Sequence, residues 1–330
     1  MRLAPVITIA AALAVSIPAE GNGRFPASVN VRLAPLNPNA ILLPSTFGLL
    51  VSNDAGASFR WICEDAIGYG GTFDPDYAVT SDGTLYATTF QGLRRSVDGG
   101  CSWTTVSLGI LPADTWVAEV AVGRDSSVWV TTATTAQLND VLVKRPYTGQ
   151  GFVGVGLETA TGWWKSIEVA PSDPDRVYLT GYEVNGKNGS TPTVHLRRTD
   201  DAGDTWEVLS TDDFVFGSEP QLYIEAISPK NADIVFARVA GSELPVGDSL
   251  YRSTDAGANW TRVLTTGDVI TGVVVRRDSD SVIVATINDG VRISTTGGTA
   301  DSFQSITSPP RMACIAENPD GVLFGCGANW

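Results

Sequence analysis

Histidine occurs once in this chain of 330 residues, as His195. Catalytic zinc normally takes two or three nitrogen ligands from the protein, so a histidine-based zinc centre is excluded. A Ser-His-Asp triad would have to use His195, but no Gly-x-Ser-x-Gly phrase is present to supply the nucleophile. We therefore interpret His195 as a half-buried strand residue rather than a catalytic base.

Basic residues are also scarce. Lysine and arginine number 22 against 36 aspartates and glutamates, which gives a formal net charge of −14. A nucleic-acid ligand needs a basic surface to meet its phosphates, so we exclude one, whereas cationic or neutral partners remain open. The sequence holds no Cys-x-x-Cys pair, no Gly-rich phosphate loop and no twelve-residue calcium loop. We therefore predict no metal and no cofactor.

Long apolar runs and helical periodicity are missing after residue 20, so we predict no membrane span. The N-terminus differs from the rest. Arg2 precedes an apolar stretch over residues 4–17, and small residues around Ala19 suit a cleavage site. We expect residues 1–19 to be a signal peptide and residues 20–330 to form one domain, secreted or periplasmic and monomeric.

One short phrase recurs along the chain: Ser/Thr-x-Asp-x-Gly-x-x-Trp/Phe. It reads SNDAGASF at 52–59, SVDGGCSW at 96–103, TDDAGDTW at 199–206 and STDAGANW at 253–260. Weaker copies are RPYTGQGF at 145–152 and STTGGTADSF at 294–303. Self-similarity at a period of roughly 40–55 residues is typical of propellers, solenoids and arrays. The intervals suit a blade of four strands.

Apolar or alternating residues flank each copy, so each is predicted to be the turn of a β-hairpin. The aspartate can accept hydrogen bonds from nearby amides, the glycine can adopt positive φ, and the aromatic ring can anchor the turn against its own blade. We interpret these residues as structural: Asp54, Gly56, Phe59, Asp98, Gly100, Trp103, Asp201, Gly203, Trp206, Asp255, Gly257 and Trp260.

The phrase resembles the Asp-box, or bacterial neuraminidase repeat, of the sialidase/sortilin-like superfamily, which also includes xyloglucanases and the plant photosystem II stability factor. This resemblance implies an all-β fold, a β-propeller of four-stranded blades, with each Asp-box between the third and fourth strands. The resemblance leaves the chemistry open, because the family contains both hydrolases and binding proteins.

The spacing predicts six blades, which are followed by two further strands over residues 312–326. We therefore expect a seven-bladed propeller whose last blade is incomplete. The six blades are expected at residues 28–63, 75–107, 116–156, 165–210, 222–264 and 269–307.

The four cysteines would form disulfides if the protein is exported. Cys314 and Cys326 flank the turn at Asn318 to Gly321 and would face each other across one hairpin. Cys63 ends the first blade and Cys101 lies in the second repeat, so this pair could link neighbouring blades. We favour the bridges Cys63–Cys101 and Cys314–Cys326; the alternative is free buried thiols.

No catalytic site emerges from the sequence. The Arg-Ile-Pro phrase of sialidases has its nearest match in Arg24-Phe25-Pro26, which departs at the middle position. Tyr223 and Glu225 lie on one face of a strand, as ordinary alternation requires. A hydrolase of the xyloglucanase type would need two placed acids, and the remaining candidates sit in proline-containing turns: Asp74, Asp76, Asp173 and Asp175.

Aromatic residues provide the best candidates for ligand binding. Trp163 and Trp164 are adjacent in a predicted strand, so one of them would point out of the blade, where it could stack on a sugar ring or a peptide side chain. The alternative is that both pack between blades. We therefore predict a glycan- or protein-binding module, with a sialidase-like or other glycoside hydrolase as the alternative function.

Overall fold

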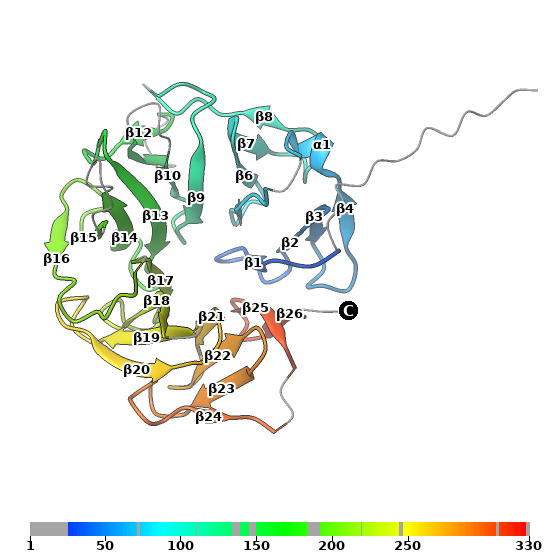
Figure 1. The fold of residues 1–330 in the computed structure, drawn as a ribbon. Coiled ribbons are helices and arrows are strands. Elements are labelled where there is room, and N and C mark those ends of the chain that lie inside the picture. Colours follow the sequence, from blue (N-terminus) through cyan, green and yellow to red (C-terminus); the bar gives the residue numbers. More distant parts are fainter. Residues whose placement is uncertain are drawn as a thin grey trace, which may run out of the picture.

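The protein is a ring of antiparallel sheets around a central axis, shown end-on for the computed structural model in Figure 1. The structure describes residues 26–70, 73–109, 111–133, 139–144, 150–183, 192–218, 220–243, 247–307 and 310–327. Within each sheet the strands follow chain order from the axis to the rim. The expected all-β propeller of four-stranded blades is confirmed, whereas the predicted signal peptide lies outside the described residues.

Six sheets have four strands each. The first contains β1 (Arg32–Leu33), β2 (Ile41–Ser45), β3 (Gly48–Ser52) and β4 (Arg60–Ile62). The second contains β5 (Tyr77–Val79), β6 (Leu85–Thr89), β7 (Gly92–Ser96) and β8 (Thr104–Thr105). The third contains β9 (Val117–Val122), β10 (Val128–Thr132), β11 (Val141–Lys144) and β12 (Val153–Gly154).

The fourth sheet contains β13 (Gly162–Val169), β14 (Val177–Glu183), β15 (Thr193–Thr199) and β16 (Glu207–Leu209). The fifth contains β17 (Leu222–Ile227), β18 (Val235–Glu243), β19 (Gly247–Ser253) and β20 (Thr261–Thr265). The sixth contains β21 (Ile270–Val275), β22 (Val282–Thr286), β23 (Gly290–Ser294) and β24 (Gln304–Ser305). A single short helix, α1 (Glu64–Ile67), links the first two sheets in the described part of the chain.

The second strand of a blade is covered on both faces, and its sequence reflects this. All five residues are buried in β6, β10 and β22, which are runs of apolar residues and threonine. Continuous apolar runs are expected wherever neighbouring layers cover both sides of a sheet. The core therefore consists of apolar layers between adjacent blades, and one such layer joins Leu85 and Trp103 of the second blade to Leu49 of the first.

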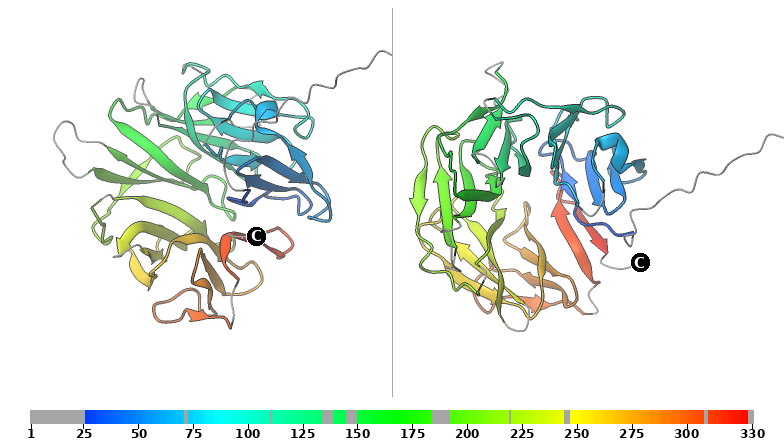
Figure 2. Two further views of the ribbon diagram at one scale, coloured as in Figure 1. Left: turned by 45° about the vertical axis from the view of Figure 1, so that its right-hand side comes forward. Right: turned by 45° about the horizontal axis from the view of Figure 1, so that its top comes forward.

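Six four-stranded blades are found, and the expected seventh blade is not. After β24 the described chain forms only two strands, β25 (Met312–Glu317) and β26 (Leu323–Gly327), which pair as a hairpin. Two strands cannot make a four-stranded blade. The hairpin instead fills the gap in the ring between β21 and β1, where it packs against both (Figures 1 and 2).

Side-chain packing closes the ring at this hairpin. Phe324 packs in one apolar cluster with Val31 and Ile41 of the first blade. The Asn318 side-chain amide donates to the Pro38 carbonyl at 3.3 Å. The first and last parts of the described chain are therefore joined by contacts rather than by a shared strand.

Of the two predicted disulfides, one is present and one is not. Cys314 and Cys326 are directly opposite in the β25–β26 ladder and form a disulfide, with their Cα atoms 5.1 Å apart. Cys63 and Cys101 are exposed free thiols, so the predicted Cys63–Cys101 bridge is wrong. The Cys101 sulfur instead accepts a hydrogen bond from the Arg60 guanidinium at 3.3 Å.

The four complete copies of the repeated phrase lie between the third and fourth strands of their blades. We call them the repeated turns (residues 52–59, 96–103, 199–206 and 253–260). Three of the four turn glycines lie against the preceding blade in the ring, and Gly56 lies against Phe324 of the closing hairpin. At Gly203, with φ of +90°, an added Cβ would lie 2.9 Å from the Trp129 ring, and at Gly257 it would lie 2.7 Å from Leu209. These glycines allow the blades to pack closely.

The ring aromatics of the turns also pack across the blade boundary, and not against their own blade alone as expected. Trp206 meets Trp129 of the third blade edge-on, with 6.3 Å between ring centroids. Trp260 packs with Leu209 of the fourth blade. Phe59 is the exception, because 42% of it is exposed.

Candidate functional site: the central channel

The carboxylates of the repeated turns are occupied by hydrogen bonds within their own turns. Asp54 accepts from the Ser58 hydroxyl at 2.6 Å, from the Ser58 amide at 2.9 Å and from the Ser52 hydroxyl at 2.8 Å. The Gly56 amide donates to the same Ser52 hydroxyl at 2.9 Å. The same set of bonds recurs around Asp98, Asp201 and Asp255.

These bonds stabilise the ionised acids. Hydrogen bonds from the Ser58 hydroxyl and amide lower the pKa of Asp54 to about 2, and those from Thr205 lower the pKa of Asp201 to about 2. Four carboxylates held separately at the rim of four blades cannot cooperate on one substrate. Each carboxylate stabilises the turn to which it belongs.

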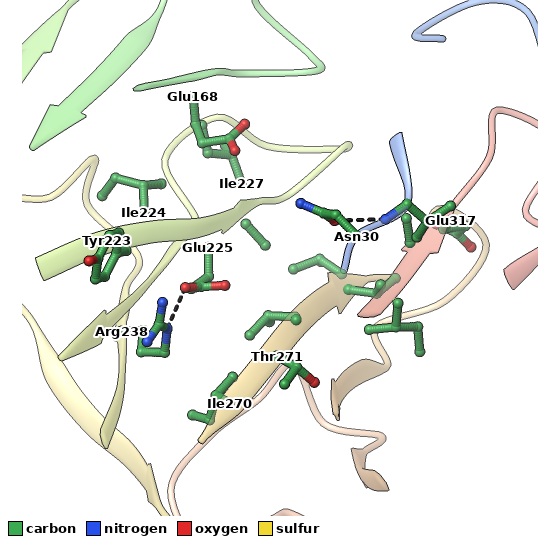
Figure 3. A pocket seen from close by; sticks show the side chains of 18 of the residues that line it. Asn30, Glu168, Tyr223, Ile224, Glu225, Ile227, Arg238, Ile270, Thr271 and Glu317 are labelled. Carbon is green, nitrogen blue, oxygen red and sulfur yellow. Dashed lines mark hydrogen bonds and ion pairs between the residues drawn. The ribbon is translucent and has the colours of Figure 1, made fainter. Parts of the chain in front are cut away.

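A cavity of about 540 Å³ opens along the axis of the ring (Figure 3). Its walls come from the innermost strands β1, β9, β13, β17, β21 and β25. A lone glutamate stands in each of four of these otherwise mostly apolar strands and lines the cavity: Glu119 in β9, Glu168 in β13, Glu225 in β17 and Glu317 in β25. We call this cavity the central channel.

Acids at or near the innermost strands hold neighbouring blades together. Asp76 accepts from Arg32 at 2.7 Å and from the Val120 amide at 3.2 Å. Glu119 accepts from the Ile167 amide of the next blade at 3.0 Å. The sequence predicts that Asp76 initiates a turn; in the structure it links three blades, because it directly precedes β5, which packs against β1 and β9.

Glu225 has a dedicated cation. Arg238 of β18 donates to Glu225 at 2.5 Å and to the buried Asp248 at 3.2 Å, and its guanidinium lies 4.5 Å from the centre of the Tyr223 ring. Figure 3 shows Tyr223, Glu225 and Arg238 on one wall of the channel. Tyr223 and Glu225 do share one strand face, as alternation predicts, and that face lines the channel.

Glu168 differs from the other acids. Within the described residues, its carboxyl accepts no hydrogen bond and forms no ion pair. Desolvation and the negative charges of Asp76 and Glu225 outweigh the attraction of Arg32 and raise the pKa of Glu168 to about 7. Desolvation, Asp76 and Glu168 likewise raise the pKa of Glu119. The channel therefore has more carboxyl groups than its arginines neutralise.

The two predicted binding tryptophans point to opposite faces of β13 and do not form one platform. Trp164 is buried in the layer facing the third blade and donates from its indole nitrogen to the Leu157 carbonyl at 3.0 Å. Trp163 is half-buried and meets Tyr182 edge-on at 5.6 Å. His195 is half-buried in β15, and its ring centre lies 6.0 Å from that of Trp164.

Within the described ranges, no group of three or more histidines, cysteines, aspartates or glutamates is arranged to hold a metal ion. The same residues include no helix that is long and apolar enough to cross a membrane.

No protein-family model matches the chain, and no curated protein matches it either. Similar solved structures include the GH74 xyloglucanase from Xanthomonas campestris (16% identity, TM-score 0.58) and an ancestral GH74 enzyme (17% identity, TM-score 0.61). The comparisons cover 86% and 93% of this chain but only 46% and 44% of those chains, so this chain spans less than half their length.

YCF48 from Cyanidioschyzon merolae is also similar, at 15% identity and a TM-score of 0.57, over 92% of this chain and 93% of that one. A structure of YCF48 bound to D1 peptide matches at 14% identity and a TM-score of 0.50, over 78% and 75%. At these identities the likeness is one of fold, and it identifies the chain as a β-propeller.

Proposed function

We propose that this protein is an exported β-propeller of the Asp-box class that acts as a binding module and takes a cationic group of its ligand into the central channel. The observation that carries the proposal is Glu168, a channel carboxyl without a partner among the described residues and with a raised pKa. A ligand ammonium or guanidinium would neutralise the excess negative charge that Glu168 shares with Glu119 and Asp76.

The ligand class follows from size and charge. A channel of about 540 Å³ accepts a side chain or a sugar unit, not a folded domain. The similarity to YCF48 extends over nearly the full length of both chains, and a YCF48 structure contains a bound peptide. These observations support a protein ligand that presents lysine or arginine; a glycan with a free amino group offers the same charge.

Calorimetric titration with two short peptides tests the proposal. One carries a central lysine between glycines, and the other carries norleucine, which has no charge at the same position. We expect the lysine peptide to bind at least tenfold more tightly, and Glu168→Gln to remove that preference. Glu207→Gln, which changes an exposed acid of β16, is the control. Equal binding of the two peptides would contradict the proposal, and so would the absence of binding by both peptides and by the glucosamine oligomer described next.

Glucosamine and N-acetylglucosamine trisaccharides extend the test to glycans. These two differ in the amino charge, so a preference for glucosamine oligomers over both peptides would assign the channel to a glycan ligand.

Glycoside hydrolysis is the second candidate, and one observation favours it. Hydrolysis of a glycosidic bond needs a protonated acid and an ionised carboxylate. Glu168 has a raised pKa, and Asp76, which is paired with Arg32, is close enough to contribute to that shift. Assays with xyloglucan and a fluorogenic sialoside decide it: turnover that Glu168→Gln abolishes and Asp54→Asn leaves unchanged would make the protein an enzyme.

A further inference from the structure

A second cavity, of about 250 Å³, lies between the third and fourth blades. Its walls come from the connection between β12 and β13 and from β13, β14 and β15. It shares no lining residue with the central channel. At this volume it holds one small ring, because drug-sized ligands need roughly 300 Å³ or more.

A glycine in the middle strand shapes the floor of this cavity. Trp164, Gly181 and His195 are aligned across three adjacent strands. A Cβ on Gly181 would lie 2.7 Å from the Trp164 ring, so the glycine allows the indole to lie across the sheet toward His195. The hydrogen bond from Trp164 to Leu157 fixes the indole. Trp164 is only 5% exposed, so a fixed part of its indole, and not a whole ring face, borders the pocket.

Polar groups surround this part of the indole. Glu183 accepts a hydrogen bond from the Thr161 hydroxyl, and its other carboxylate oxygen lies 3.5 Å from the His195 ring nitrogen. Burial and the neighbouring positive charge of Arg197 lower the pKa of His195, although Glu183 opposes this shift. Hydroxyl groups of a ligand therefore meet both a donor and an acceptor here.

Arg197 is the unusual member of the pocket. Among the described residues its guanidinium makes no hydrogen bond and no ion pair, and one of its terminal nitrogens is buried without a partner. Burial lowers the pKa of Arg197, and no neighbouring carboxylate opposes this. The next residue shows the contrast, because Arg198 binds Asp200, Glu207 and the Ala256 carbonyl. A desolvated cation without a counter-ion is costly, and a ligand carboxylate would relieve that cost.

We infer that this pocket binds a single carboxylate-bearing sugar, such as a hexuronate unit, with its carboxylate on Arg197 and its ring beside the part of the Trp164 indole that borders the pocket. Arginine is suited to this contact because its planar fork can donate two parallel bonds to a carboxylate. Sugar rings present C–H faces that pack on aromatic rings, and the Glu183 and His195 side chains stand where ring hydroxyls would lie. The site is independent of the central channel.

Titration of the full chain with sodium glucuronate, followed by calorimetry, tests the inference. We expect one binding site per chain, with glucose and sodium acetate each at least tenfold weaker, because each lacks one of the two recognised groups. Arg197→Gln should weaken glucuronate binding at least tenfold. Arg311→Gln, which removes the same charge from an exposed position, should leave it unchanged.

Circular dichroism shows whether Arg197→Gln is folded. If it is not, Arg197→Lys keeps the charge but loses the fork, and several-fold weaker binding is expected. No binding of glucuronate to the unmodified protein, equal affinity for glucose or acetate, or unchanged affinity in either Arg197 variant would overturn the inference. Binding of the lysine peptide to the channel should be unchanged in Arg197→Gln, so the two proposals fail separately.

Discussion

Arg32 of the first blade donates to Asp76 of the second from two guanidinium nitrogens, at 2.7 and 3.1 Å. The residues are 44 positions apart in sequence, and Arg32 lines the channel together with Glu119 and Glu168. Desolvation alone would lower the pKa of Arg32, but the attraction of Asp76, Glu168 and Glu119 raises it. One arginine thus faces three acids, which is more negative charge than it can neutralise.

Replacing this arginine should therefore destabilise the ring. Removing one partner of a buried ion pair costs roughly 3–5 kcal/mol, and we expect about 2 kcal/mol for Arg32→Met because the pair is partly exposed to the channel. Asp76→Asn removes a carboxylate that Arg32→Met leaves without its cation, and it keeps an acceptor for the Val120 amide. The double variant should therefore regain part of the stability that Arg32→Met loses, and Asp76→Asn alone is the third variant of the cycle. Urea denaturation measures all three; strictly additive effects would contradict the coupling.

The raised pKa of Glu168 predicts how stability depends on pH. The folded protein holds the Glu168 proton up to a pH of about 7, whereas the unfolded chain releases it near its ordinary value of 4.5. Between these two pH values the folded state binds more protons than the unfolded chain. The free energy of unfolding that the protonated Glu168 provides below pH 4.5 is therefore lost as the pH rises to 7.

This loss should be on the order of 2 kcal/mol, less than the full shift implies because Glu168 is only half-buried and borders the channel. Denaturant unfolding at pH 4.5, 6 and 8 measures it, and Glu168→Gln should reduce the slope over that range, while Glu119 and Asp140, whose pKa values are also raised, account for the slope that remains. The same slope in wild type and variant would mean that another group titrates. The acids of the repeated turns do not interfere, since their pKa values are lowered below this range.

Two glycines with similar φ angles allow two effects of a Gly→Ala substitution on stability to be measured separately: backbone strain and disturbed packing between blades. Gly203 has φ of +90° and touches Trp129, whereas Gly83 has φ of +86° and no atom within 4 Å of an added Cβ. Gly83→Ala should cost about 1 kcal/mol from the backbone alone. Gly203→Ala should cost roughly 2–4 kcal/mol, because the methyl group also pushes the third blade away.

Thermal or urea unfolding of both glycine variants provides the comparison. Equal losses would mean that the turn glycines serve backbone conformation only and do not determine how closely the blades pack.

The sequence was sufficient to predict the blades, because each repeat encodes one hairpin through local chemistry. Asp201, Gly203 and Trp206 carry the same signal as their counterparts, and no contact from a distant blade is needed to read it. Predicting the binding site, in contrast, would have required knowledge of contacts between distant blades. Glu168 and Arg32 are 136 positions apart, and their proximity follows only when the ring closes and brings the first strand of every blade to one axis.

Sequence spacing also failed to predict the disulfide pairing of cysteines that lie in different blades. Cys314 and Cys326 face each other across one hairpin, a local relation that their spacing reveals. Cys63 and Cys101 belong to different blades, and nothing in their spacing fixes the direction of either side chain. A usable signal for the channel was present but missed: one glutamate within an otherwise mostly apolar strand, as in VAEVAV around Glu119.

The two cysteine pairs should differ in reactivity. Cys63 and Cys101 are exposed free thiols, while Cys314 and Cys326 are bonded and buried, at 1% and 5% exposure. We expect a thiol reagent to modify two cysteines per native chain, and mass mapping to place both modifications at Cys63 and Cys101. Unfolding without reductant should release no further thiol, whereas unfolding with reductant should expose four.

Cys314→Ser paired with Cys326→Ser completes the test of the disulfide. The bridge holds together the hairpin that closes the ring, and closing a loop of about a dozen residues contributes roughly 3 kcal/mol by restricting the unfolded chain. The double variant should therefore unfold at lower urea, while Cys63→Ser should not. A single peptide linking Cys63 to Cys101 in the unreduced digest would show that these two thiols are bonded after all.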